Sequence, residues 1–492
     1  MSDLTTDPRT PVLVGVGTAH RPTDGSAGIE PVELMVEAAV AAAADAGAPG
    51  LLASVTWLAV PEGNWSYPDP ARLVAAGVGA PGARTVRADI GVPQVTPVDV
   101  AIDRIARGEL EVALVVGGEA MASRLRTQRA GGEPTETDQG DAEPDDRWVP
   151  EGEIMADAEV QAGIWAPVEQ YACIDNALRH AEGRTVDEHL DEIAALWARF
   201  NAVAAANPEA AFPEPRTASS LRTAGPGNRP LASPYAKWHS TQWSVDQAGA
   251  LILCSAGAAR AAGVPTDRWV FPHLALESSH MLSMSRRAEV HRWPAMRVLG
   301  GAAAEHLGRR LDEVEHVECY SCFPAAVRVQ QRELGLPLDG TPTLTGGMAF
   351  AGGPLNNFTY QATAAVVPVL RERPGELGMV TTVSGLLTKP GLTVWSARPP
   401  ATPVLVADLG GRAAAATHAL ASTHAGSGAA TVVTATATYE GEDPVKAFVV
   451  ADLADGRRWV GSTHDPAFVR RVVSEEVIGT PVEVRGGECT PA

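Results

Sequence analysis

The sequence contains few of the residues that mark a secreted, a nucleic-acid-binding or a membrane protein. It has 5 cysteines in 492 residues, which is too few for a disulfide framework. Its formal net charge of −20 at pH 7 disfavours attraction to nucleic acid or anionic lipid, since both need a basic surface. No run of about eighteen apolar residues is present, and no basic segment followed by an apolar one opens the chain. These absences favour a cytoplasmic protein without a membrane span.

What the sequence does contain is enough apolar material for two or three domains. Hydrophobic residues make up 45% of the chain, which predicts a large folded core. Short apolar segments that read as buried strands alternate with helical segments, first over residues 11–121 and again over residues 245–400. Strand–helix–strand order thus repeats in two halves, as in α/β proteins. Residues 131–153 are acidic and rich in Gly and Pro, and they are expected to form a solvated loop.

The stretch around which the rest is organised runs from Val317 to Tyr360. A predicted strand ends in Tyr320-Ser321-Cys322-Phe323, a helix opens at Pro324, and a glycine-rich turn follows at Gly346–Pro354. Glycines allow the backbone to approach another segment or a ligand closely. A strand tip opposite such a turn is how α/β proteins build binding sites, so we expect a site here.

The order of these pieces resembles the thiolase family, close to its sterol-carrier-protein branch. There the strand ends in Asn-Glu-Ala-Phe or His-Asp-Cys-Phe, and a Gly-Gly-x-x-x-x-Gly-His-Pro turn follows; the matching segments here are 320–323 and 346–354. The resemblance implies a thiolase fold, with two doubly wound α/β halves and an inserted cover domain. It assigns residues 1–121 to the N-terminal half, 122–242 to the loop (cover) domain and 243–400 to the C-terminal half.

Residues 401–492 extend beyond the family's usual end. Strand-like segments are separated there by the turn signals Asp443-Pro444 and Asp455-Gly456. The pattern predicts a small antiparallel β domain, similar to an OB barrel. Acidic residues outnumber basic ones in this segment, which disfavours nucleic-acid binding.

The residues that carry the family's chemistry are absent from the matching positions. The family has a reactive cysteine just before the helix that Thr96 is expected to cap, and Gly91 stands there, or Val92 if the register slips by one. Gly353 replaces the histidine of the glycine turn. Val383, in Val383-Ser384-Gly385, replaces the second cysteine. Chemistry through a covalent acyl-cysteine is therefore not expected.

Several polar residues remain as candidates for catalysis or binding. The resemblance places Tyr320 in the pocket, where a phenol can donate a hydrogen bond to an oxyanion; the alternative is a tyrosine packed at a strand end. Ser321 and Cys322 are further catalytic candidates by position. Asn356 and Asn357 either bind a thioester carbonyl or serve the turn alone. The other residues expected to contact coenzyme A are Gly352, Gly353 and Ser384.

No metal and no cofactor other than a coenzyme A thioester as ligand is expected. Cys319-x-x-Cys322 is half of a zinc motif without a second pair, so both cysteines are interpreted as core residues. Four histidines occupy positions that the family does not use and are interpreted as structural: His239, His273, His280 and His291.

Three functions stay open. The first is a thiolase-like acyl-CoA-binding protein of lipid metabolism without ordinary thiolase activity. The second, implied by the resemblance to cysteine-less steroid-side-chain retro-aldolases, is cleavage of a β-hydroxyacyl-CoA with Tyr320. The third is an auxiliary protein that docks a partner through residues 401–492. Thiolases pair through their core sheet, so we expect a homodimer, or a monomer if the C-terminal domain blocks that face.

Overall fold

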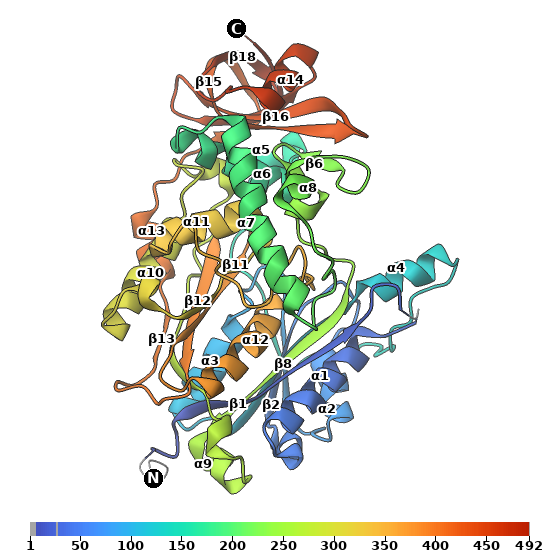
Figure 1. Cartoon of the computed structure of the whole chain (residues 1–492), viewed down its shortest axis with the longest axis vertical. Coiled ribbons are helices and arrows are strands. Elements are labelled where there is room, and N and C mark those ends of the chain that lie inside the picture. The colour runs from blue at the N-terminus through green and yellow to red at the C-terminus, as the bar shows by residue number, and fades with distance from the viewer. Residues whose placement is uncertain (1–5, 26–27, 492) are drawn as a thin grey trace.

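The protein, described by a computed structural model over residues 6–25 and 28–491, has three units. Figure 1 shows a layered core near the N-terminus, a helical cover segment beside it, and a small β barrel at the opposite end. The expectation of no leader segment concerns residues that lie partly outside the described range. Within that range, no helix is both long and apolar enough to cross a membrane.

The first core sheet contains one strand that follows the cover segment. In spatial order its strands are β1 (Pro11–Arg21), β8 (Asp246–Ser255), β4 (Val112–Ala120), β2 (Trp57–Pro61), β3 (Arg84–Ala88) and β5 (Asp146–Trp148). β8 pairs antiparallel with β1 and β4, and the strands from β4 to β5 pair in parallel. β4 and β8 are buried along their whole length, as expected for strands covered on both faces.

The second core sheet is formed by the C-terminal part of the core. In spatial order its strands are β10 (His316–Glu318), β11 (Gly378–Ser384), β12 (Lys389–Ser396), β9 (Phe271–Glu277) and β13 (Leu405–Asp408). β12 runs antiparallel to β11 and β9, while the outer pairs are parallel. The tip that follows β10 carries Tyr320, so this sheet delivers the predicted site residues.

Helices separate and cover the two sheets. α3 (Thr96–Ala106) and α12 (Phe358–Glu372) each contact strands of both sheets and form the middle layer (Figure 1). α1 (Pro31–Asp45) packs on the first sheet and α10 (Pro294–Leu307) on the second. This arrangement confirms the predicted pair of α/β halves. The remaining core helices are α2 (Pro70–Gly77), α9 (Ala256–Ala261), α11 (Pro324–Leu334) and α13 (Gly410–Ala416).

The cover segment is mainly helical and reaches both the core and the barrel. Its elements are α4 (Met121–Arg129), α5 (Asp157–Ala162), α6 (Pro167–Ala181), α7 (Val186–Ala206), α8 (Ala218–Arg222), β6 (Pro230–Ala232) and β7 (Tyr235–Ala236). α6 packs on the barrel and on α11 of the core. Short 3-10 turns complete the chain at Pro49–Ser54, Lys237–His239, Thr266–Arg268, Met284–Arg286 and Leu311–Glu313.

The C-terminal strands close into a barrel. Its elements are β14 (Ser422–Thr423), β15 (Gly426–Glu440), β16 (Asp443–Leu453), β17 (Arg458–Thr463), α14 (Pro466–Ser474), β18 (Pro481–Gly486) and β19 (Glu488–Pro491). β15 pairs with β16 and β18, β16 pairs with β17, and β19 joins β17 in parallel and β18 antiparallel. The ring is therefore complete, with the helix between its third and fourth strands. This confirms the expected OB-like barrel.

Two segments lie in different units from those expected. β8 was predicted to open the second half, but its pairing with β1 and β4 makes it part of the first sheet. β13 and α13 follow residue 401 yet belong to the core, because β13 pairs in parallel with β9 and α13 packs on α10. A buried apolar strand looks alike in either sheet, so the sequence pattern could not assign these segments.

Two local expectations are also corrected. α3 begins at Thr96 itself, with Val95 as its cap residue, because the Thr96 hydroxyl donates to the Glu277 carboxylate instead of capping the helix. The acidic segment 131–153 is not wholly loop, since β5 pairs with β3. Arg84 Nε lies 2.7 Å from Asp146 Oδ2, so an ion pair supports this added edge.

Candidate functional site

A cavity of ≈ 1120 Å³ lies where the two core halves meet the cover segment. Its wall combines the turn before α3, the strand tip at 320–323, the glycine turn at 346–354 and the hairpin between β11 and β12. The fold thus brings together segments that are far apart in the sequence. The predicted site residues on this wall are Gly91, Tyr320, Cys322, Gly353, Asn356, Val383 and Ser384.

The other predicted residues do not line this cavity. The buried Ser321 hydroxyl accepts a hydrogen bond of 3.1 Å from the Met348 amide. Gly352 lines a separate cavity of ≈ 470 Å³. Asn357 precedes α12, and its Oδ1 accepts a hydrogen bond of 3.4 Å from Gln361 Nε2. Ser321 therefore supports the glycine turn from behind the wall, whereas Asn357 bonds to the first turn of α12.

The two glycines at the family's catalytic positions disfavour the side chains that they replace, Gly91 by its backbone conformation and Gly353 by a clash. Gly91 has φ of +104°, and a Cβ there would lie 3.0 Å from Pro150. A Cβ at Gly353 would lie 2.1 Å from Cγ2 of Thr241, whose hydroxyl donates a 3.0 Å hydrogen bond to the Cys322 carbonyl. The loss of the reactive cysteine and histidine is therefore fixed by backbone conformation and by packing.

The Tyr320 hydroxyl is held by Gln94, a residue that sequence reasoning missed. Gln94 Nε2 donates to Tyr320 Oη at 3.0 Å. Gln94 Oε1 accepts from the Thr359 amide at 3.2 Å and from the Thr359 hydroxyl at 2.9 Å. A backbone amide can only donate, so it fixes which end of the Gln94 amide is the oxygen. Tyr320 therefore receives the bond from Gln94, and its own proton stays available to a ligand.

The wall offers hydrogen-bond donors and cations, and its neutral groups keep their protons at neutral pH. Burial raises the pKa of the Cys322 thiol to about 12. Burial also raises the pKa values of Tyr171 and Tyr320 above the ordinary range of tyrosine. Within residues 6–25 and 28–491, no Asp, Glu or His lines the cavity. A thiolate at Cys322 is therefore not available as a nucleophile.

The four histidines interpreted as structural do not line this wall. Burial lowers the pKa of His239 to about 4, and its Nδ1 accepts a hydrogen bond of 3.1 Å from the Ala236 amide. His273 Nε2 lies 3.0 Å from the Arg398 carbonyl. Burial also lowers the pKa values of His280 and His291.

The two cysteines of the half-motif, Cys319 and Cys322, are buried and free. In the described part of the chain, no group of three or more His, Cys, Asp or Glu side chains is placed to hold a metal ion. A zinc site built on these cysteines would need two more ligands.

The hairpin between β11 and β12 is strained and is linked to the barrel. Gly385, Leu386 and Leu387 have φ of +62°, +60° and +58°, a conformation that costs free energy for the leucines. Arg287, buried behind the wall, donates through Nη2 to the Leu386 carbonyl at 2.7 Å. Arg458 of the barrel donates in turn to the Arg287 carbonyl at 2.9 Å. The barrel thus supports the cavity wall at a strained point.

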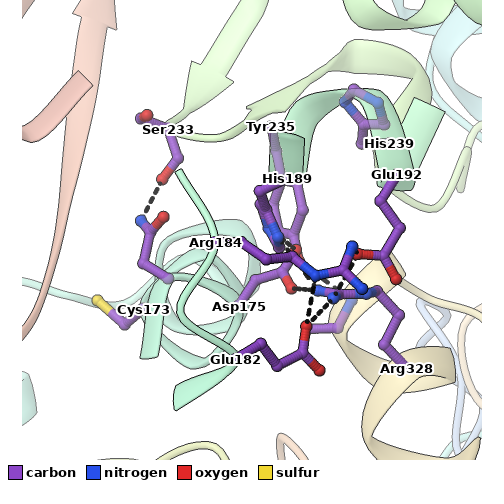
Figure 2. A network of polar contacts seen from close by, with 12 residues as sticks. Cys173, Asp175, Glu182, Arg184, His189, Glu192, Ser233, Tyr235, His239 and Arg328 are labelled. Atoms are coloured by element: carbon purple, nitrogen blue, oxygen red, sulfur yellow. Dashed lines mark hydrogen bonds and ion pairs between the residues drawn. The ribbon is translucent and has the colours of Figure 1, made fainter. Parts of the chain in front are cut away.

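A buried network of charged groups fixes the cover segment to α11, the helix that follows the Tyr320 tip (Figure 2). Arg328 on α11 donates to Asp175 on α6 at 2.9 Å, and to Glu182 and Glu192 at 2.7 and 3.0 Å. Tyr235 donates to Asp175 at 2.8 Å and accepts from a backbone amide in the first turn of α11 at 3.2 Å. The network therefore positions the start of α11, next to the wall.

Cationic and aromatic side chains lie at the open end of the cavity. Arg129, Arg229 and Lys237 line it and are exposed or partly exposed, and Trp243 beside them is 50% exposed. The chain as a whole carries a net charge of −20, whereas the described residues that line this cavity include these three cations and no Asp or Glu. Such an opening attracts anions, and the indole offers a flat face for stacking.

No protein-family model and no curated protein matches the chain, whereas solved structures do. A monomeric SCP2-thiolase-like protein type 1 from Mycobacterium smegmatis matches with a TM-score of 0.83 at 28% identity, over 99% of this chain and 100% of that one. The Ltp2-ChsH2(DUF35) aldolase matches with a TM-score of 0.61 at 20% identity, over 80% of this chain and 99% of that one. The dimeric peroxisomal thiolase of Saccharomyces cerevisiae matches with a TM-score of 0.56 at 15% identity, over 80% of this chain and 99% of that one. The last two show a likeness of fold alone.

Proposed function

Since this chain is a thiolase-like protein of the SCP2-thiolase-like branch, we propose that its central cavity binds an acyl-CoA thioester and that it lacks ordinary thiolase activity. The observation that carries the proposal is the cavity itself. It lies between the two halves and keeps a hydrogen-bond donor at Tyr320, yet it excludes side chains at 91 and 353.

The open end of the cavity supports the choice of ligand. Coenzyme A carries phosphate groups and an adenine ring, and the opening offers Arg129, Arg229 and Lys237 together with Trp243. Cations bind phosphate by charge-assisted hydrogen bonds, and an indole stacks on a purine. The apolar interior of the cavity then suits an acyl chain.

Calorimetric titration with acetyl-CoA and longer acyl-CoAs tests binding. We expect Arg229→Ala and Lys237→Ala each to weaken binding about tenfold, since a hydrogen bond to a charged group contributes about 1.5 kcal/mol. Arg310→Ala is the matched control, because Arg310 is a cation whose side chain is 75% exposed and lies outside the cavity. Equal binding by all three variants would argue against the assigned opening.

An acetoacetyl-CoA thiolysis assay tests the second part of the proposal. We expect no turnover above the uncatalysed rate, because the positions of the covalent nucleophile and of the histidine are glycines, which carry no functional group. Turnover at a rate typical of enzymes would refute it.

The retro-aldolase hypothesis is a second candidate, and the Tyr320 hydroxyl on the wall is the observation that favours it. The bond between the α and β carbons would break as the β-hydroxyl proton passes to solvent water, since the described wall holds no carboxylate or imidazole. The β carbon becomes a carbonyl, and Tyr320 donates to the thioester oxygen of the enolate that forms. The test is cleavage of a β-hydroxyacyl-CoA by the wild type and by Tyr320→Phe. Equal rates would remove Tyr320 from the mechanism.

We also propose that the chain is a monomer. Thiolases pair through the core sheet, and here β5 pairs with β3 and covers the edge of the first sheet. The barrel is therefore not needed to block that edge. Light scattering after size exclusion should give the mass of one chain, 51.2 kDa; a mass twice as large would overturn the proposal.

A further inference from the structure

The cavity is equipped to stabilise negative charge on oxygen, but not to remove a proton. Tyr320 can only donate into the cavity, since Gln94 occupies its acceptor side. Asn356 also lines the cavity, and its Nδ2 is buried without an acceptor among the described residues. The Tyr320 donor suits the oxygen of a thioester as it becomes an enolate, whereas Asn356 Nδ2 is shielded and could reach that oxygen only after its side chain turns.

Most routes to a thioester enolate need a base. Claisen condensation removes an α proton, and retro-aldol cleavage removes a hydroxyl proton. The described wall residues contain no carboxylate or imidazole, and the thiol of Cys322 and the phenols of Tyr171 and Tyr320 stay protonated at neutral pH. Loss of CO2 from a β-carboxylate is a route that removes no proton.

We propose that the cavity catalyses decarboxylation of a β-carboxyacyl thioester, a reaction that rests on the proposed acyl-CoA binding. The bond between the α carbon and the carboxylate breaks, and its electron pair forms the enolate, whose oxygen accepts a hydrogen bond from Tyr320. Water then protonates the α carbon, and the hydroxide that remains combines with CO2 as bicarbonate. Atoms and charge balance without an oxidant, a reductant or a metal.

The apolar part of the cavity wall fits this step. Phe323, Val383 and Leu386 line the cavity and give it apolar surface. A carboxylate is poorly hydrated beside such a surface, whereas the neutral CO2 that it becomes needs little hydration. The apolar surface therefore favours loss of CO2. The fixed donor at Tyr320 lies ready for the charge that moves to the thioester oxygen.

The experiment is to incubate the full chain with malonyl-CoA and methylmalonyl-CoA and to follow acetyl-CoA and propionyl-CoA by chromatography. In D2O, the product should gain one deuterium at the α carbon for each carboxylate lost. Tyr320→Phe should lower kcat about 10²–10³-fold with little change in KM, as for the loss of one oxyanion donor. The ring of this variant still packs edge-on against Phe358, at 5.8 Å, so the fold should be kept.

Gln94→Leu tests a positioning role, since Gln94 acts through Tyr320. It should lower kcat and leave the KM for malonyl-CoA nearly unchanged, and Tyr320→Phe/Gln94→Leu should be no slower than Tyr320→Phe alone. A purely structural role would instead lower both kcat and folding stability in an additive way.

The outcomes separate this inference from the proposed function. Malonyl-CoA that binds in calorimetry but releases no CO2 would overturn the inference and leave acyl-CoA binding intact. Binding of no acyl-CoA at all would overturn both. Decarboxylation at an equal rate in Tyr320→Phe would overturn the assigned donor, and cleavage of β-hydroxyacyl-CoA in place of decarboxylation would show that a base is present.

Discussion

Arg328 is the residue whose loss should loosen the cover segment most. It is 1% exposed, and it contacts Asp175, Glu182 and Glu192 in the buried network (Figure 2). Arg328→Met keeps the volume of the side chain but leaves Asp175 buried with His189 and Tyr235 alone. Removal of one partner from a buried ion pair costs about 3–5 kcal/mol, so we expect a loss of that size in the free energy of unfolding.

The matched control is Arg222→Met. Arg222 also bridges two carboxylates, Asp187 and Asp191, but these are 86% and 69% exposed. Solvent screens this pair, and the expected loss is below about 1 kcal/mol. Urea titration followed by tryptophan fluorescence gives both numbers, and hydrogen exchange along α7 locates the loosened region.

The pH dependence supplies a second test. Burial alone would raise the pKa of Asp175, but His189 and Arg328 outweigh it and hold the pKa below its ordinary value. In the wild type this carboxylate therefore adds stability above pH 4, which is lost as the pH falls further. In Arg328→Met, Asp175 keeps His189 and Tyr235 but loses a cation, so its pKa should lie less far below the ordinary value. The variant should therefore lose less stability than the wild type as the pH falls below 4. If Arg328→Met lost less than about 1 kcal/mol of unfolding free energy, or if its stability depended on pH as that of the wild type does, the assigned role of the network would be refuted.

The remaining predictions concern the cavity wall. Gly91→Cys should not restore thiolysis of acetoacetyl-CoA and should destabilise the fold by about 1–3 kcal/mol, because of its φ of +104° and the contact with Pro150. Gly353→His should cost about 1–3 kcal/mol or more, since Thr241 occupies the space; thermal unfolding measures both losses. Arg458→Met should weaken acyl-CoA binding threefold to tenfold, although Arg458 does not line the cavity. This change corresponds to about 1 kcal/mol, the contribution of one hydrogen bond that supports the hairpin. Calorimetry checks this against Arg457→Met, an exposed neighbour.

The architecture could be predicted from the sequence because it depends on repeated local signals. Apolar strands, helix starts and turn residues recur along the chain, and the order of the motifs fixed the fold class and the OB-like barrel. The sheet to which a strand belongs depends on contacts between distant segments. This is why β8 and β13 belong to other units than those expected from their positions in the sequence.

The site was less predictable than the fold, for the same physical reason. Gly91, Tyr320, Gly353 and Val383 were found because motifs mark their positions, and all of them line the cavity. Gln94 carries no motif, and its partner lies 226 residues away. Ser321 sits beside Tyr320 in the sequence, yet the alternation of a strand tip turns it toward the Met348 amide.

The missing cysteine and histidine are more than substitutions of side chains. Had only the side chains changed, the space for them would remain, and a single reversion could recover the old chemistry. Instead, the left-handed backbone and the tight contact with Pro150 disfavour a side chain at Gly91, and Thr241 occupies the space beside Gly353. Pro150 belongs to the same acidic segment whose strand β5 covers the edge of β3. One segment thus contributes both to the crowded nucleophile position and to the covered sheet edge. Deletion of residues 131–153 should therefore change the oligomeric state and open the wall at Gly91 in the same variant. Size exclusion measures the first effect, and acyl-CoA titration measures the second.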